Sequence, residues 1–469
     1  MKFDLIIRNA LVVDPLSRTA EVADVAVHNG RIECVCPELS ADGTHEIDAK
    51  GLVLQPGVID SHLHLSVDPR SHSMVARAGV TTAVDMSGPT DAILEQAREH
   101  GRGLNIAVLN AVLPGRNVSG NSPDEAELDR FMDASLAAGA FGVKLLGGHF
   151  PLTPDSSACM VRKADEKNVY MAWHAGTTEK GSDITGLEEA VTLCDGHPLH
   201  LAHLNAYCRG RVADVLEECR RAAALLEKHP EIVTESYLSS RNGCPFDFND
   251  DGTPKSKIAV RNLELFGYRA DKHGACDAIR SGRLSVLVPE ADDVKLLSGE
   301  AGAEYFLEAV NAGRHVDGSF AGVNPFLSRH FFLTAKRADG SFLTDAISTD
   351  GGGLPRNVIL EDGLSFVRLG ELSAVDFARK TSLLPALMLG FTEKGTLLPG
   401  ADADITVYDP MTQRAVHTFA MGRPLLLEGK LAGAGATVIC TPAGQEAVAR
   451  AGLEAYVVKG GFHALNRLG

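Results

Sequence analysis

The segment PGVIDSHLHL, residues 56–65, places two histidines one residue apart directly after an apolar run. Successive side chains of a β-strand point to opposite faces, so His62 and His64 would share a face while Leu63 points the other way. Two neutral imidazoles a few ångströms apart suit a divalent metal ion, whereas two protonated ones repel each other. The alternative, two surface histidines on an edge strand, fits the apolar neighbours poorly. This strand therefore predicts part of a metal site, whose other ligands must come from elsewhere in the chain.

Length and composition describe a large globular protein. The chain has 469 residues, of which 45% are hydrophobic and 23% charged, and a formal net charge of −16. A strongly acidic chain with no clustered basic face argues against a nucleic-acid partner. No apolar run reaches the length of a membrane span, and the start lacks a signal-peptide cleavage site, so we expect a soluble cytoplasmic protein. The nine cysteines have no framework spacing, which is typical of reduced thiols.

The order of apolar runs and helical stretches predicts a (β/α)₈ barrel. Short strands alternate with helical segments from about residue 58 onward, as in βα units with a parallel sheet. Eight such strands favour a closed barrel. They are expected at residues 58–65, 81–86, 105–113, 141–146, 169–175, 199–205, 232–238 and 346–350.

The domain organisation follows from what lies outside this rhythm. About a hundred residues separate the seventh and eighth strands, so we expect an inserted, partly helical lobe at about 240–345 within a barrel of residues 56–395. Four short strands are predicted before the barrel, at 3–8, 11–14, 22–28 and 31–36. Strand-like pieces return near the C-terminus, so residues 1–55 and 396–469 together are expected to form one small β-sandwich.

Six polar side chains stand at the carboxyl ends of five of these predicted strands. Active sites of such barrels form where the carboxyl ends of the strands meet. Any one of these residues has an ordinary explanation, such as a hydrogen-bonded core histidine or a turn aspartate. Six together are hard to explain as core residues, because buried charges need partners. They are His62, His64, Lys144, His174, His203 and Asp350.

Lys144 is unusual in this group, since a protonated amine beside divalent metals would be repelled. Carbamylation by carbon dioxide would turn it into an anionic oxygen donor able to bridge two metals. Carbamylation needs the neutral amine, and deprotonating an ordinary lysine at pH 7 costs about 4.6 kcal/mol, which metal ligation would have to offset. The alternative is a lysine paired to an acidic neighbour.

The motifs PGVIDSHLHL, GAFGVKLL, WHAG, LAHLN, ISTDGGG and KGTLLPGADADITVYDP together resemble the amidohydrolase superfamily, in order and over nearly the whole chain. The resemblance is strongest to the branch with D-aminoacylases, isoaspartyl dipeptidases, dihydroorotases and hydantoinases. It implies a distorted (β/α)₈ barrel with a composite β-sandwich. It also implies that His62 and His64 bind one metal, His174 and His203 a second, with carbamylated Lys144 as the bridge. Asp350 would be both a ligand and the proton shuttle.

The function implied is metal-dependent hydrolysis of a non-peptide amide bond by a metal-bridging hydroxide, with zinc as the default for a nitrogen-rich ligand set. The spacing of 29 residues from His174 to His203 is similar to that of D-aminoacylases, which favours N-acyl amino acids. The lysine of GVKLL instead follows the dihydroorotases, so a cyclic amide is the alternative. A deaminase or a non-catalytic relative is less favoured. Family members are often homo-oligomers, and we expect one here.

Substrate-binding candidates come from the loops after the strands. Arg241 and Arg356 could bind a substrate carboxylate, while Tyr237 and Asn205 could donate to the substrate carbonyl or anchor the substrate backbone. An ordinary loop role is the alternative for each of these four. Arg329, within the insertion, is a further candidate. Three other histidines, His149, His197 and His200, are not expected to bind metal. The segment DFNDDG, residues 247–252, resembles half a calcium loop but lacks the glutamate at its twelfth position, so a polar turn is the better interpretation.

Overall fold

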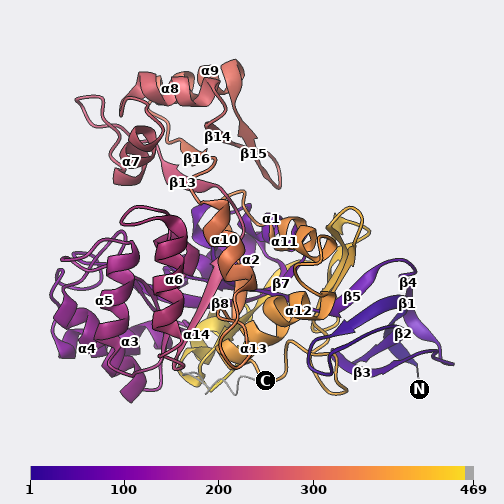
Figure 1. Cartoon of the computed structure of the whole chain (residues 1–469). Coiled ribbons are helices and arrows are strands. Elements are labelled where there is room, and N and C mark those ends of the chain that lie inside the picture. The colour runs from indigo at the N-terminus through magenta and orange to yellow at the C-terminus, as the bar shows by residue number, and fades with distance from the viewer. Residues whose placement is uncertain (1, 460–469) are drawn as a thin grey trace.

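Eight parallel strands curl into a distorted (β/α)₈ barrel, which confirms the fold class predicted from the sequence (Figure 1). The computed structural model describes residues 2–459. The eighth strand is followed by β18 (Gly351–Gly352), which pairs with the first and returns the sheet to its start. The barrel strands are β6 (Val58–His64), β7 (Val80–Asp85), β8 (Arg102–Val112), β9 (Gly142–Leu146), β10 (Tyr170–His174), β11 (Leu199–Leu201), β12 (Ile232–Tyr237) and β17 (Ala346–Ser348).

Helices cover the outside of these strands, so the strands are buried on both faces and read as nearly continuous apolar runs. Several helices begin at a side-chain cap. Asp183, for example, accepts hydrogen bonds from the backbone of Thr185 and Gly186 at the start of its helix. The helices around the barrel are α1 (Ser71–Arg77), α2 (Thr90–His100), α3 (Glu125–Ala137), α4 (Pro154–Glu166), α5 (Ile184–Cys194), α6 (Val215–Leu226), α10 (Phe326–Thr334), α11 (Ile359–Arg368), α12 (Ala374–Ala378) and α13 (Leu384–Leu389).

Both ends of the chain meet in one nine-stranded sheet beside the barrel, which we call the end sheet (Figure 1). Strand β5 joins the two contributions, because it pairs with β1 on one side and β19 on the other. The end sheet contains β1 (Phe3–Asp14), β2 (Thr19–His28), β3 (Arg31–Cys36), β4 (Gly43–Asp48), β5 (Val53–Pro56), β19 (Ile405–Asp409), β20 (Arg414–Ala420), β21 (Arg423–Leu427) and β22 (Lys430–Leu431).

The first two predicted strands are one strand in the structure. β1 runs through the expected break, where its pairing with β2 shifts register between Ile7 and Ala10. Asn9 lies in this shift with a φ of 60°, a conformation that asparagine tolerates better than most residues. A bulge, rather than a turn, accounts for the polar pair in the middle of the apolar run.

The C-terminal tail divides between two sheets, which differs from the expected boundary of residues 396–469. Strands β23 (Gly435–Cys440) and β24 (Glu454–Val457), with α14 (Gln445–Arg450) between them, extend the barrel sheet instead of the end sheet. β9 pairs with β8 only from Leu109 onward, which leaves the same edge of the first half of β8 without a neighbour from the barrel. β23 pairs with β8 there, from Arg102 to Ala107. Covering this edge satisfies backbone groups that would otherwise remain open.

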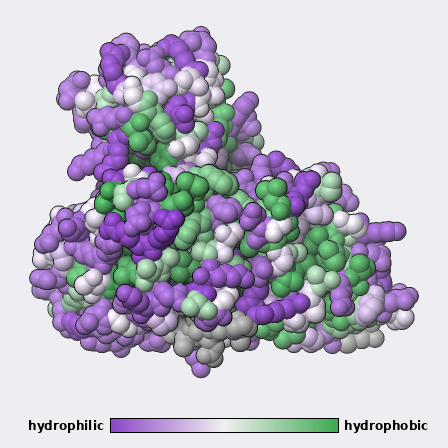
Figure 2. All heavy atoms as spheres, in the orientation of Figure 1, coloured by the Kyte–Doolittle hydropathy of each residue, from purple (hydrophilic) through white to green (hydrophobic). Residues whose placement is uncertain are grey.

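An inserted lobe between β12 and α10 stands above the carboxyl ends of the barrel strands (Figure 1). Its four-stranded sheet and three helices enclose a separate apolar core that includes Phe246, Phe306 and Phe320. On the face shown in Figure 2, the outer part of the lobe is mostly hydrophilic. The lobe contains β13 (Asn242–Pro245), α7 (Lys257–Leu265), α8 (Lys272–Arg280), β14 (Leu284–Pro289), β15 (Val294–Leu297), α9 (Gly299–Asn311) and β16 (Asp317–Phe320).

The helices of residues 2–459 include none that is both long and apolar enough to cross a lipid bilayer.

Candidate metal centre and active site

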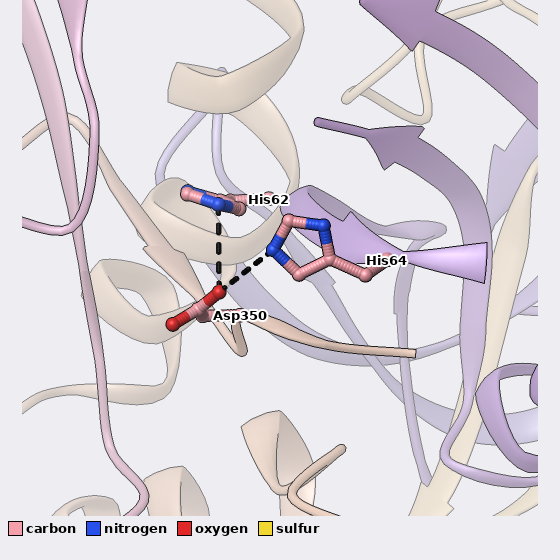
Figure 3. A group of neighbouring side chains, drawn as sticks. All are labelled: His62, His64 and Asp350. Carbon is pink, nitrogen blue, oxygen red and sulfur yellow. Dashed lines mark hydrogen bonds and ion pairs between the residues drawn. The ribbon is translucent and has the colours of Figure 1, made fainter. Parts of the chain in front are cut away.

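His62, His64 and Asp350 converge at the mouth of the barrel (Figure 3). Both histidines come from β6, and Asp350 lies between β17 and β18. The Oδ1 atom of Asp350 is 3.5 Å from Nε2 of His62 and 3.0 Å from Nε2 of His64. One potential ligand atom from each residue lies within 4.8 Å of the others, a spacing that could hold a metal ion.

Glu235 fixes the orientation of His62. Its Oε1 atom lies 2.6 Å from Nδ1 of His62, and both side chains are buried. Burial acts to raise the pKa of Glu235, but His62 and His200 hold it well below its usual range. The ionised carboxylate can only accept, so Nδ1 of His62 must donate and Nε2 keeps its lone pair for a metal. Burial, together with Lys144, lowers the pKa of His62 to about 4, which favours the neutral ring.

His174 and His203 form a second pair. Nδ1 of His174 lies 3.0 Å from Nε2 of His203, and burial holds the pKa of both rings well below the usual value. His203 follows β11 with a φ of 37°, and its backbone N–H donates to Oε2 of Glu235 at 2.7 Å. A histidine in this left-handed conformation is strained, and such strain concentrates at functional sites. Nδ1 of His203 has no hydrogen-bond partner among the described residues.

Lys144 is fully buried between these pairs, with its Nζ atom 3.4 Å from Nε2 of His62. Within residues 2–459 it has no ion pair with a carboxylate, so the alternative of a structural Lys144 salt bridge lacks support. Burial lowers its pKa to about 8, against the attraction of Glu235 and Asp350. The neutral amine is therefore far more accessible than in an exposed lysine.

Asp350 also contacts Arg356, whose Nη2 atom lies 2.8 Å from Oδ2 of the carboxylate. Burial acts to raise the pKa of Asp350, but Arg356 and the hydrogen bond from His64 hold it well below its usual range. Asp350 has a φ of 52°, and its backbone N–H donates to the carbonyl of His62 at 2.7 Å. The backbone bond places this ionised carboxylate beside the histidines.

The donor set fits divalent metals. Neutral imidazoles and an ionised carboxylate are typical zinc ligands. His62 and His64 present nitrogen atoms to one point with Asp350, and one nitrogen each of His174 and His203 lie 3.0 Å apart. The carboxylate behind His62 supplies the outer support that metal-binding histidines usually have. All six ligands predicted from the sequence therefore lie around one region of the barrel mouth.

A cavity of about 280 Å³ opens from these residues toward the inserted lobe. The histidines, Lys144 and Asp350 line it on the barrel side, and residues of β13 and α7 line it on the lobe side. Arg356 lines it as well, although its guanidinium is held by Asp350. A small molecule could enter here and reach the histidines.

Three substrate-binding candidates point elsewhere. Arg241 donates toward Ser285 and the carbonyl of Ser319 in the lobe sheet, and it is not among the residues around the cavity. The Tyr237 hydroxyl bonds to Asn324 and receives a bond from Arg209, whereas Asn205 accepts from the backbone of Tyr237.

These contacts give Arg241, Tyr237 and Asn205 supporting positions behind the cavity wall. Arg329 likewise donates to backbone carbonyls of Leu238 and Asn324.

The other histidines separate into different environments. His200 is buried beside Tyr170 and Glu235, whereas His197 pairs with Asp165 at the surface. His149 lines the cavity with its ring centroid 5.5 Å from that of His174. The 247–252 segment forms a turn closed by Asp251 and Thr253.

Sequence reasoning missed Glu235, although its acidic side chain stands out within the apolar segment IVTESYL. It also missed Ser87 and Ser182, which bond to Nδ1 of His64 and Nε2 of His174. Serines in loops give no comparable signal, because their contacts depend on the folded geometry.

Comparison with known proteins identifies the class. The model of the amidohydrolase family matches residues 53–432, and the chain belongs to this family. A dihydroorotase of Solibacter usitatus is 35% identical over 128 residues, covering 24% of this chain and 30% of that protein. An allantoinase of Escherichia coli is 40% identical over 94 residues, covering 18% and 20%. The chain thus matches less than a third of the length of these curated relatives.

Solved structures share the fold at low identity. N-acyl-D-glutamate deacylase from Bordetella bronchiseptica has a TM-score of 0.65 and 18% identity, covering 93% of this chain and 99% of that one. A D-aminoacylase has a TM-score of 0.64 and 19% identity over the same shares. Dihydropyrimidinase from Brevibacillus agri has a TM-score of 0.61 and 16% identity, covering 98% and 99%.

Proposed function

We propose that the protein hydrolyses a non-peptide amide bond, most simply that of an N-acyl amino acid. The observation that carries this proposal is the position of Asp350, whose Oδ1 atom faces the Nε2 atoms of both His62 and His64. When bound, two divalent ions, most simply zinc, would supply Lewis-acid chemistry and lower the pKa of a water molecule.

His62 and His64 would hold one ion, and His174 and His203 the other. The neutral amine of Lys144 would attack carbon dioxide, form a carbon–nitrogen bond and release one proton, leaving an anionic carbamate between the two sites. The depressed pKa of about 8 supports this step, because it raises the fraction of amine at neutral pH.

Asp350 would act as base and then as acid. Its pKa lies well below the usual range, so the carboxylate is ionised. Its Oδ1 atom, which faces the histidines, would accept a proton from the attacking water. It would then donate that proton to the leaving nitrogen, which an amide requires because a free amide anion is a poor leaving group. Arg356 holds the second carboxylate oxygen and so orients the first toward the reacting atoms.

Opening of a cyclic amide is the second candidate. The two curated relatives described above are named dihydroorotase and allantoinase, and the lysine of GVKLL in this chain resembles the dihydroorotase pattern. The same residues would act on either substrate, since both reactions add water to an amide carbonyl.

Turnover tests the proposal. Protein reconstituted with zinc and bicarbonate would be assayed against both enantiomers of N-acyl amino acids and against hydantoins, dihydropyrimidines and lactams. Cleavage of open-chain amides supports the first candidate, and cleavage of rings alone supports the second. If a zinc-loaded protein cleaved neither class, the proposed function would be wrong.

A further inference from the structure

Three arginines from two parts of the chain, Arg209, Arg211 and Arg261, line the cavity together, and we call them the arginine wall. Arg209 and Arg211 follow the short helix Leu204–Tyr207 on the barrel, and Arg261 lies on α7 of the lobe. Arg211 and Arg261 are exposed and Arg209 is half-buried. The barrel and the lobe thus each contribute positive charge to one surface, in a chain whose net charge is −16.

The three guanidinium groups lie near one another without a carboxylate in ion-pair contact, within residues 2–459. Arg211 is exposed as a whole residue, but its guanidinium lines the cavity, where desolvation, followed by Arg209 and Arg261, lowers its pKa to about 10. Within the described part of the chain, none of the three forms an ion pair with a carboxylate. Asp183 attracts Arg211 without an ion-pair contact, and its Oδ1 atom accepts hydrogen bonds from the backbone at the start of α5. Like charges held together in this way favour an anionic ligand.

Neutral contacts hold two of these arginines in place. The guanidinium of Arg209 donates to the hydroxyl of Tyr237 at 2.8 Å and to Oδ1 of Asn324 at 2.9 Å. Arg211 approaches the carbonyl of Ser182 at 3.4 Å, and the hydroxyl of Ser182 lies 2.8 Å from His174. These bonds orient the arginines through neutral groups, and Ser182 alone separates Arg211 from the histidine pair.

Asn262 provides an independent indication of a ligand. Its side chain is 1% exposed and lines the same cavity, next to Arg261 in the sequence. Neither its Oδ1 nor its Nδ2 atom has a hydrogen-bond partner among residues 2–459. Unmade hydrogen bonds of a buried amide cost free energy, so such groups usually have a partner in the working state. A ligand in the cavity could donate to the one atom and accept from the other.

We propose that Arg209, Arg211, Arg261 and Asn262 form an anion subsite that selects substrates with a second anionic group, carboxylate or phosphate, besides the α-carboxylate. The substrate class is therefore an N-acylated acidic amino acid, with its side-chain anion at the arginine wall and its amide at the histidines. This inference rests on the proposed function for the identity of the scissile bond, although binding at the arginines is separate from catalysis.

Binding of matched ligands tests the subsite. Calorimetry on zinc-loaded Asp350→Asn protein would compare N-acetylglutamate, N-acetylphosphoserine and the neutral N-acetylglutamine, each as both enantiomers. The Asp350→Asn background keeps bound amides intact during the titration. We expect an anionic ligand to bind about tenfold more tightly than N-acetylglutamine, and the tighter of the two anions identifies the group.

Arg261→Gln should remove most of this preference, and Arg211→Gln with Arg261→Gln should remove it entirely, with binding of N-acetylglutamine unchanged. Arg269→Gln is the matched control, because Arg269 is an exposed lobe arginine outside the cavity. In protein that retains Asp350, Arg261→Gln should raise KM for the acidic substrate and leave kcat little altered.

Equal binding of charged and neutral ligands, or a preference that survives loss of both arginines, would overturn the subsite even if amides are hydrolysed. Charge-dependent binding by a protein that cleaves no amide would support the subsite and reject the proposed function. The experiment therefore distinguishes failure of the anion subsite from failure of the proposed amide hydrolysis.

Discussion

The two oxygens of the Asp350 carboxylate make different contacts, because Oδ2 lies 2.8 Å from Nη2 of Arg356. The other oxygen, Oδ1, faces the histidines of β6. This division keeps the group ionised and fixes which oxygen can exchange a proton. Arg356 thereby acts as a positioning residue for the candidate acid–base group. Because its guanidinium is paired with Asp350, it is not a free anchor for a substrate carboxylate.

Asp350→Asn should abolish turnover while most of the metal remains. The amide has nearly the same shape but cannot accept a proton, and loss of a general acid–base group typically slows a reaction by about 10²–10⁴-fold. The measurement is kcat together with zinc content on the same sample. Loss of all zinc along with activity would instead make Asp350 chiefly a ligand.

Lys144→Ala should lower both zinc content and turnover, because it removes the group proposed to bridge the two sites. Zinc content by elemental analysis and turnover with added bicarbonate check this expectation. Lys295→Ala, at an exposed lobe lysine, is the control. Full zinc and full turnover in Lys144→Ala would refute the bridging carbamate.

Glu235→Gln should weaken zinc binding by about 10–100-fold, as is typical when the carboxylate behind a metal-binding histidine is lost. The neutral amide can no longer hold Nδ1 of His62 as a donor with the same strength, and its contact with the backbone of His203 is also weakened. Competition with a chelator measures the affinity. Trp173, the single tryptophan and fully buried, reports by fluorescence whether the fold is intact.

Stability of the protein should fall as the pH drops from about 6.5 toward 4, in part because of His72. Burial, followed by His100 and Arg102, lowers its folded pKa to about 4 from the ordinary 6.5. Between these values the unfolded chain binds more protons, so unfolding becomes more favourable as pH falls. The contribution is about 3 kcal/mol at most, from a shift of some 2.5 units.

His72→Leu should flatten this part of the pH dependence, since the ring nitrogens of His72 have no partner within the described residues. His45→Gln, at an exposed histidine, should leave it in place. Chemical unfolding at pH 4.5 and 7, followed by Trp173 fluorescence, gives the two free energies. If the free energy of unfolding changes equally between pH 4.5 and 7 in wild type and His72→Leu, His72 does not contribute to the pH dependence.

Much of the barrel could be predicted because its signals are local. Apolar runs of strand length and the polar residue at each strand end are written in the sequence, so the positions of His62, Lys144 and Asp350 followed from the pattern. The arginine wall could not be predicted in this way. Arg209 and Arg261 are 52 residues apart and meet through the packing of lobe against barrel, which no periodicity records.

The tail shows the same limit. The strand of residues 435–440 has the composition of any buried strand, and its choice between the end sheet and the barrel depends on the free edge of β8. That edge exists because β8 starts earlier than β9, a feature of the assembled sheet. Arg241 shows the same limit, since its place after a strand suggests the cavity while its side-chain contacts lie in the lobe sheet.

The most direct test of the account is amide hydrolysis during a zinc titration of the metal-free protein in bicarbonate buffer. We predict that hydrolysis of an N-acyl amino acid is absent without metal, rises as zinc binds and is lost again on chelation. No hydrolysis of any amide at full zinc occupancy, or hydrolysis that chelation leaves unchanged, would contradict the central claim.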